Sequence, residues 1–268
     1  MERFRNKIVC VFVLFLMVFF VVSASCNESK FDWESVLVMP PGSEETSGNQ
    51  ILHFKSVNKP YWHDETSRLF VEECLQNAAP LKSDAEVLKC ASDHMIFKGL
   101  IIELGVCTGK TINFLAALNP YQTIYGFDSF EGLPEDWIRN DKIIPKGTFG
   151  FKNQGEFPPV LKNVSLIKGS FDYSIDYFLR SLVTLQPIAL LHVDSDLYSS
   201  AITALTKLEA LILPGTVIIF DEFYNYPGFE NHEFKAFQEF LVRNNFRANY
   251  LAYNIYHEQV ALIIENND

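Results

Sequence analysis

Over its last two thirds, the chain alternates short apolar runs with longer stretches in which apolar residues recur at helical spacing. Strand-length apolar runs cover residues 100–104, 123–127, 164–168, 188–193 and 216–220. Helical stretches lie between most of these runs, at residues 111–118, 175–185 and 199–213. Alternating strands and helices indicate an α/β fold whose sheet is mostly parallel, with helices on both faces.

Both flanks of this alternating region also have interpretable patterns. Toward the C-terminus, Phe234, Phe237 and Phe240 predict an amphipathic helix, and residues 247–253 and 259–264 predict an antiparallel hairpin at the sheet edge. On the N-terminal side, residues 61–98 have helical periodicity in two stretches. Ser83 and Glu86 in the second stretch resemble a capping box. We expect these two helices to form a cap over one end of the sheet.

The first 60 residues have the pattern of a targeting segment followed by a linker. Basic residues precede an apolar run at 8–22, and small residues follow at 23–25. A helix over the run would measure about 22 Å, short of the ~30 Å hydrocarbon core. Residues 1–25 therefore predict a cleaved signal peptide that engages the secretory membrane, with an uncleaved single-pass anchor as the alternative. The predicted localisation is the secretory pathway, and residues 26–60 read as a polar linker.

Residues 131–163 have no clear periodicity and are rich in glycine, proline and charged residues. A loop of this length within a domain usually has a functional role. We expect it to fold over the ligand site as a lid.

The composition narrows the range of partners. The chain has 268 residues and a formal net charge of −11. An acidic surface repels phosphate backbones, so we expect no nucleic-acid partner. The oligomeric state stays open, with a homo-oligomer as one alternative.

The first strand of the alternating region ends in Glu103 and leads into a turn that contains Gly105 and Gly109. A strand, a glycine turn and a helix start form a receptor for a nucleotide-like cofactor. A phosphate loop needs four residues between its glycines, and only three lie here. A dinucleotide fingerprint fails because Cys107 stands where its second glycine belongs. The pattern favours S-adenosylmethionine, whose cationic end tolerates the carboxylate of Glu103.

Two later positions fit the same cofactor. Asp128 follows the second strand, about 20 residues after Gly109, where a carboxylate accepts hydrogen bonds from ribose hydroxyls. Ser170 follows the third strand and is expected beside the adenine.

The fourth and fifth strands end in acidic residues. Asp194 follows one, and Asp221 and Glu222 follow the other. The carboxyl ends of adjacent parallel strands meet at one edge of the sheet, so these side chains are expected to converge. Three oxygen ligands suit Mg²⁺, which lowers the pKa of a bound hydroxyl and orients it. We expect His192 to pack behind these residues and not to bind the metal itself.

Four sequence motifs resemble those of a known family. They are Glu103-Leu104-Gly105-Val106, the run from Gly126 to Pro134, the run from His192 to Ser200, and the stretch from Pro214 to Phe223. Over residues 99–240 the chain resembles the macrocin O-methyltransferase family.

This resemblance implies a Rossmann-like class I methyltransferase fold for residues 99–268, with S-adenosylmethionine as the methyl donor. It also implies Mg²⁺-assisted methylation of a hydroxyl on a small molecule, in known members on a sugar. The metal would lie on Asp194, Asp221 and Glu222, and Asp194 would also be the base.

Two other functions stay open. A lumenal glycosyltransferase would use Asp194 and Asp196 as a metal-binding Asp-x-Asp motif. A non-catalytic protein with a methyltransferase fold would keep the domain as a binding module.

Overall fold

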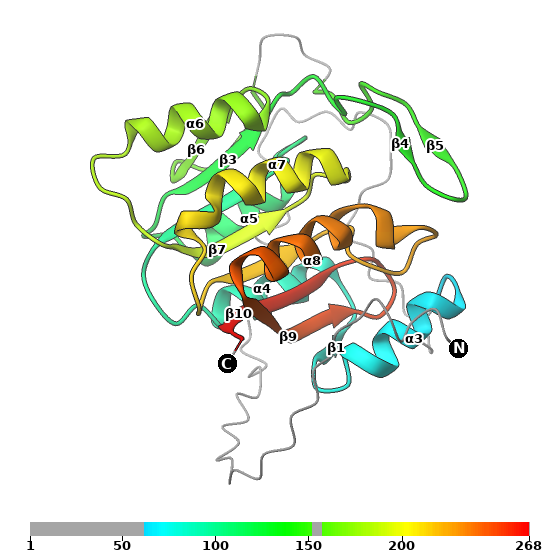
Figure 1. Ribbon diagram of the computed structural model, residues 1–268. Coiled ribbons are helices and arrows are strands. Elements are labelled where there is room, and N and C mark those ends of the chain that lie inside the picture. The colour runs from blue at the N-terminus through cyan, green and yellow to red at the C-terminus, as the bar shows by residue number, and fades with distance from the viewer. Residues whose placement is uncertain (1–61, 152–156, 268) are drawn as a thin grey trace, which may run out of the picture. The chain divides into compact units, whose positions relative to one another are not determined.

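The computed structural model of the chain describes residues 62–151 and 157–267 (Figure 1). The predicted leader (1–25) and linker (26–60) lie outside the described residues. Within the described ranges, no helix combines the length and the apolar character that a membrane span requires.

The core of the domain is an eight-stranded sheet in the order β1-β9-β10-β8-β7-β2-β3-β6. The strands are β1 (Ala79–Leu81), β2 (Leu100–Leu104), β3 (Ile124–Asp128), β6 (Val164–Lys168), β7 (Ile188–Val193), β8 (Val217–Phe220), β9 (Phe246–Asn254) and β10 (Val260–Asn266). Every residue of β2, β7 and β8 is buried, because helices cover both faces of the central strands. Only β10 runs against the other strands of this sheet.

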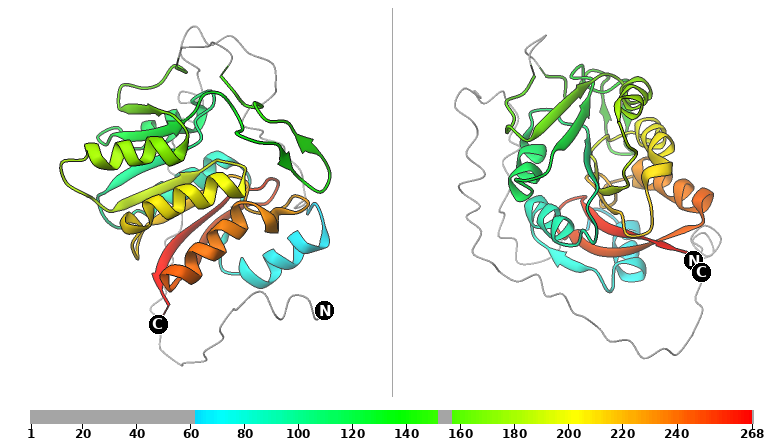
Figure 2. Two further views of the ribbon diagram at one scale, coloured as in Figure 1. Left: turned by 45° about the horizontal axis from the view of Figure 1, so that its top comes forward. Right: turned by 90° about the vertical axis from the view of Figure 1, so that its left-hand side faces the viewer.

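Helices form a layer on each face of the sheet, as the edge-on view of Figure 2 shows. On one face lie α6 (Phe171–Ser181), α7 (Tyr198–Leu208) and α8 (Glu233–Asn244), with α7 packed between the other two. On the other face lie α4 (Asp84–Asp93) and α5 (Lys110–Leu118). Short 3₁₀ helices follow at Glu209–Leu211 and Phe229–Asn231. The predicted α/β architecture, with its mostly parallel sheet and C-terminal hairpin, is confirmed.

The N-terminal helices differ from the expected cap. Helix α4 packs on β8, β9, β10 and α5, because its apolar stripe is wide enough to cover the sheet face. Helix α3 (Glu65–Cys74) places Phe70 against aromatic rings of α8 and β9. Of these two helices, only α4 reaches the carboxyl ends of the central strands, through Ser83 and Asp84 at its start. The Ser83 hydroxyl caps this helix by accepting from the Glu86 N–H at 3.2 Å.

The hairpin strand β9 is not the edge of the sheet, because β1 pairs beside it in parallel. The segment 131–163 also contains structure that its pattern did not predict. A two-stranded hairpin joins β4 (Trp137–Ile138) and β5 (Ile143–Ile144). Strands of two residues are too short to show periodicity in a sequence.

Candidate active site at the carboxyl ends of the strands

A cavity of about 700 Å³ opens at the carboxyl ends of β2, β3, β7 and β8. The chain leaves β2 toward β3 on one side and later returns to β7 on the other, so the sheet order reverses here. Ligands of open α/β sheets bind at such a reversal. Most lining residues come from the loops that follow these strands, from α7 and from the segment after β3, and the others come from the starts of α4, α5 and α6 and from the turn between β9 and β10.

The glycine turn after β2 forms one wall of this cavity. Gly105 has a φ of +96°, and a Cβ atom on it would lie 1.7 Å from the carbonyl oxygen of Asp194. A side chain at this position would therefore push the turn away from the loop after β7. Gly109 begins α5 with a φ of +82°, but it faces residues 158–160 and is not part of the cavity lining.

Asp128 lines the cavity and also fixes the shape of the glycine turn. Its Oδ2 accepts from the N–H groups of Val106 and Cys107, each at 2.8 Å. Its Oδ1 accepts from the Phe130 N–H at 2.6 Å, which leaves capacity on this oxygen for one ligand hydroxyl. Ser170 begins α6, lines the cavity and makes no side-chain capping bond.

Glu103 lies behind the cavity wall and not in it. The side chain has no exposed surface, and the residue is not part of the cavity lining. Its Oε1 accepts from the Thr111 hydroxyl at 3.0 Å, and its Oε2 lies 2.9 Å from Nδ1 of His192. Burial raises the pKa of Glu103, and the bond to His192 opposes that rise. The structure thus corrects the expected contact with the cofactor, because β2 and β7 are neighbours and the two side chains satisfy each other.

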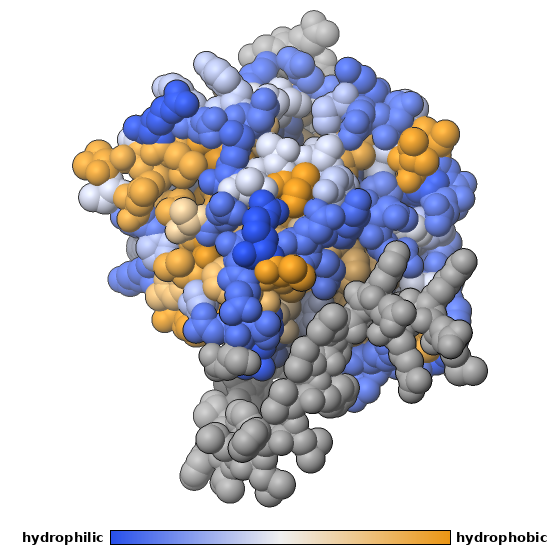
Figure 3. All heavy atoms as spheres, viewed as in Figure 1, coloured by the Kyte–Doolittle hydropathy of each residue, from blue (hydrophilic) through white to orange (hydrophobic). Residues whose placement is uncertain are grey.

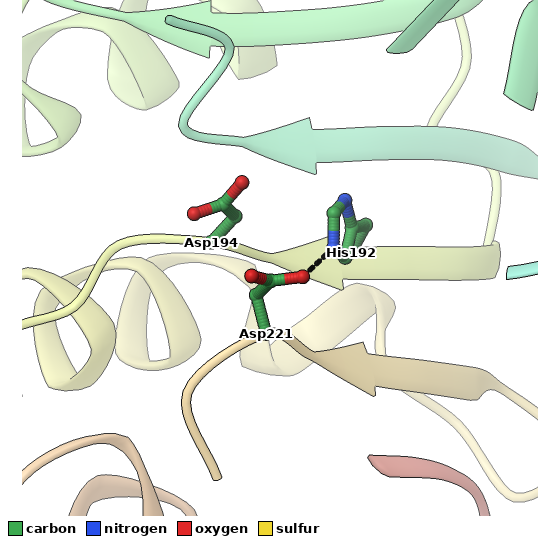
Figure 4. A group of neighbouring side chains, drawn as sticks. All are labelled: His192, Asp194 and Asp221. Carbon is green, nitrogen blue, oxygen red and sulfur yellow. Dashed lines mark ion pairs between the residues drawn. The ribbon is translucent and has the colours of Figure 1, made fainter. Parts of the chain in front are cut away.

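Asp194, Asp221 and His192 lie close together at the carboxyl ends of β7 and β8 (Figure 4), and both aspartates line the cavity. One potential ligand atom from each lies within 4.8 Å of the other two. Nε2 of His192 lies 3.7 Å from Oδ1 of Asp221, a distance typical of an ion pair and too long for a hydrogen bond. Glu222 lines the cavity beside Asp221 but is not part of this group. The structure therefore brings two of the three predicted metal ligands together, with His192 as the third member.

Burial sets the protonation of these groups. It raises the pKa of Asp194 and of Glu222 well above their ordinary values, and neighbouring carboxylates add to both rises. Burial acts on Asp221 in the same sense, but the nearby charge of His192 and the hydrogen bond that Gln259 donates outweigh it and lower the pKa of Asp221. Burial lowers the pKa of His192, yet its acidic neighbours raise it well above the ordinary value.

One buried acid beside the site is not predicted from the sequence. Glu233, the first residue of α8, is fully buried. Its Oε1 accepts from the N–H and the hydroxyl of Ser195 at 2.9 and 3.0 Å, and its Oε2 lies 3.4 Å from the Glu222 N–H. Asp196, which the sequence predicts as a ligand only for the alternative Asp-x-Asp motif, has a φ of +60° and lines the cavity. A buried acid at a helix start gives no signal in a sequence, since exposed acids are common there.

The segment after β3 forms the opposite wall of the cavity, through Gly132, Leu133, Pro134 and Phe149. Arg139, in the β4–β5 hairpin, forms an ion pair at 3.1 Å with Glu258 in the turn between β9 and β10. The guanidinium also lies 4.2 Å from the ring centre of Tyr226. The expected lid is thus part of the cavity wall in this structure.

Residues 102–223 match a family model described as a methyltransferase domain. The match spans β2 to the loop after β8, which supply most of the residues that line the cavity.

Among solved structures, this domain is similar to CalS11, described as a calicheamicin methyltransferase. The TM-score is 0.54 and the identity 22%, over 67% of this chain and 78% of that one. It is also similar to the O-methyltransferase NovP, with a TM-score of 0.50 and 17% identity over the same shares. Comparison with curated proteins finds no match. At these identities the similarity establishes the fold, and the resemblance to the macrocin family stays a prediction.

Proposed function

We propose that this methyltransferase domain uses S-adenosylmethionine and a divalent metal ion to methylate a hydroxyl group of a small molecule. One observation carries the proposal. The carboxylates of Asp194 and Asp221 converge on the same cavity that the glycine turn and Asp128 border. Methyl transfer to oxygen needs a donor site and a site that activates a hydroxyl in direct line, and this cavity offers residues for both.

The residues around the turn fit the methyl donor. Gly105 brings the backbone against the cavity, and Asp128 keeps one acceptor position for a ribose hydroxyl. Ser170 lines the cavity between β6 and α6, and we propose that the adenine binds beside it. The bound cofactor would supply an electrophilic methyl group on a sulfonium ion.

The acidic residues fit a divalent cation. Asp194 and Asp221 offer converging carboxylate oxygens, and Oε2 of Glu222 is buried without a hydrogen-bond partner among the described residues. A buried oxygen in this state is costly unless a ligand satisfies it. When bound, the metal would lower the pKa of the acceptor hydroxyl. Asp194 would take the hydroxyl proton on a carboxylate oxygen while the methyl group passes from sulfur to the acceptor oxygen.

We propose a sugar as the first acceptor class to test, from the resemblance of residues 99–240 to enzymes that methylate sugars. The match to a methyltransferase domain favours this function over a glycosyltransferase. Secretion of the protein stays a proposal that rests on residues 1–25.

The decisive experiment combines binding with product analysis. Calorimetric titration of the protein with S-adenosylmethionine and Mg²⁺ should show binding, and mass spectrometry of candidate sugars should show a methyl-sized gain that needs both. No detectable cofactor binding at millimolar concentration would overturn the proposal.

Asp194→Asn should keep cofactor binding and lose at least about 100-fold in kcat, since it removes both the base and a metal ligand. Asp93→Asn, at the exposed end of α4, is the matched control and should keep full activity. Equal activity of Asp194→Asn and the wild type would contradict the assigned role.

A further inference from the structure

His192 is fully buried, and its Nε2 has no hydrogen-bond partner among the residues that the structure describes. Buried ring nitrogens are almost always satisfied by a protein group, a water molecule or an ion. This nitrogen points toward Oδ1 of Asp221, 3.7 Å away (Figure 4). A metal ion bound to both atoms would satisfy the nitrogen and the carboxylate together.

The second ring nitrogen of His192, Nδ1, already has a partner. Nδ1 of His192 lies 2.9 Å from Oε2 of Glu103, which is itself fully buried. Glu103 in turn accepts a hydrogen bond from the Thr111 hydroxyl of α5, which helps to fix the position of its carboxylate. A carboxylate that accepts from Nδ1 fixes the orientation of the ring, so that a metal ion could take the place of the proton on Nε2 and bind the lone pair there. This is the usual support of a histidine that binds a metal.

We propose that Nε2 of His192 is a direct ligand of the metal ion, together with Asp194 and Asp221. This inference rests on the metal dependence proposed above and goes beyond it, because it changes the donor set from oxygen alone to nitrogen plus oxygen. Imidazole favours transition metals, whereas Mg²⁺ prefers an all-oxygen site. The site should therefore prefer a cation such as Mn²⁺ or Co²⁺ over Mg²⁺. Glu103 is then a positioning residue for His192 and not a cofactor ligand.

The test uses Mn²⁺ as the probe on the full chain. Pulsed electron paramagnetic resonance of the Mn²⁺-loaded wild type should show coupling to a directly bound nitrogen. Selective ¹⁵N labelling of histidine should change that coupling, which assigns it to an imidazole. Because this measurement needs no substitution, it stands even if a variant at the buried site fails to fold.

Variants then locate the nitrogen. His192→Gln should lose the coupling and bind Mn²⁺ about 10- to 100-fold more weakly, and Glu103→Gln should weaken binding over the same range. The pair Glu103→Gln/His192→Gln avoids leaving a lone buried carboxylate and should also lack the coupling. His257→Gln is the matched control, because His257 also lines the cavity, and it should keep the coupling.

Two results would overturn the inference, and they differ in what else they overturn. Mn²⁺ that binds without histidine coupling would remove His192 from the donor set but leave metal assistance intact. No binding of Mn²⁺ or Mg²⁺ at millimolar concentration would overturn both the inference and the proposed metal dependence.

Discussion

Glu233 reaches two loops at once, although it is not part of the cavity lining. Its oxygens lie against Ser195 in the loop after β7 and against the Glu222 N–H in the loop after β8. These loops carry Asp194 and Asp221, so one buried carboxylate sets the distance between the predicted metal ligands. Burial raises the pKa of Glu233 from 4.5 to about 7.

The raised pKa of Glu233 predicts a pH dependence of stability. The folded protein binds this proton more tightly than the unfolded chain, so the stabilisation is complete below about pH 4.5 and is lost as the pH rises through about 7. Glu233→Gln keeps an acceptor for Ser195 but does not titrate. Between pH 5 and pH 8 the wild type should therefore lose up to about 3 kcal/mol of unfolding free energy relative to this variant.

Urea unfolding of both proteins at pH 5 and pH 8, with a chelator present, measures this difference. Glu73→Gln, an exposed carboxylate of α3, is the control and should track the wild type at both pH values. A Glu233→Gln difference that stays constant with pH would contradict the burial of a titrating carboxylate.

The segment from β2 through the glycine turn into α5 packs closely against the end of β3 and the loop after β7. Gly105 donates its N–H to the Phe127 carbonyl at 2.9 Å, and its α-carbon faces the Asp194 carbonyl. The turn is thus joined to β3 on one side and contacts the loop after β7 on the other.

Gly105→Ala and Gly147→Ala separate backbone strain from steric collision. Both glycines have positive φ values, +96° and +80°, so each substitution costs roughly 1–2 kcal/mol in strain. A Cβ atom at Gly147 meets nothing closer than 4.0 Å, whereas at Gly105 it collides with the backbone of Asp194. Gly105→Ala should cost clearly more than Gly147→Ala in thermal unfolding, and it alone should weaken Mn²⁺ binding. Equal costs would show that the turn and the loop after β7 are not in contact.

At the scale of the whole domain, segments far apart in the sequence close the sheet around the site. Strand β1 pairs with β9, which brings Ala79 beside Ala252. Phe70 of α3 packs with ring centres 6.0 Å from Phe223, which directly follows Glu222, and 5.6 Å from Phe234. On another part of the surface, Figure 3 shows hydrophobic residues gathered in the region of α6. Val183 and Leu185, just beyond this helix, are exposed.

Phe70→Ala should destabilise the domain by about 3–5 kcal/mol, because it empties an aromatic cluster. Val242→Ala is the control, since Val242 is 83% exposed, and its effect should stay within about 0.5 kcal/mol. Chemical unfolding measures both. If Phe70→Ala also behaved like a surface substitution, α3 would not be part of the cooperative domain.

The regular elements of this protein were predictable because their signals are local. The apolar runs at 100–104, 164–168 and 188–193 form strands with those same bounds. The first and third of these strands are buried on both sides, and the second is a half-buried edge strand. Asp128, Asp194 and Asp221 follow from the rule that parallel strands present their carboxyl ends together. The capping of α4 by Ser83 likewise depends on residues three positions apart.

Only the tertiary structure decided which side chains meet. Glu103 and His192 are 89 positions apart, and they pair because β2 and β7 become neighbours when the chain reverses its direction of travel across the sheet. That pairing turns an expected cofactor ligand into a support for a histidine. Glu233, β1 and the β4–β5 hairpin escaped prediction for the same reason. The sequence by itself determined the order of strands and helices and the positions of the acidic strand ends. The roles of Glu233, β1 and the hairpin depend on burial and on distant partners, and neither leaves a periodic pattern in the sequence.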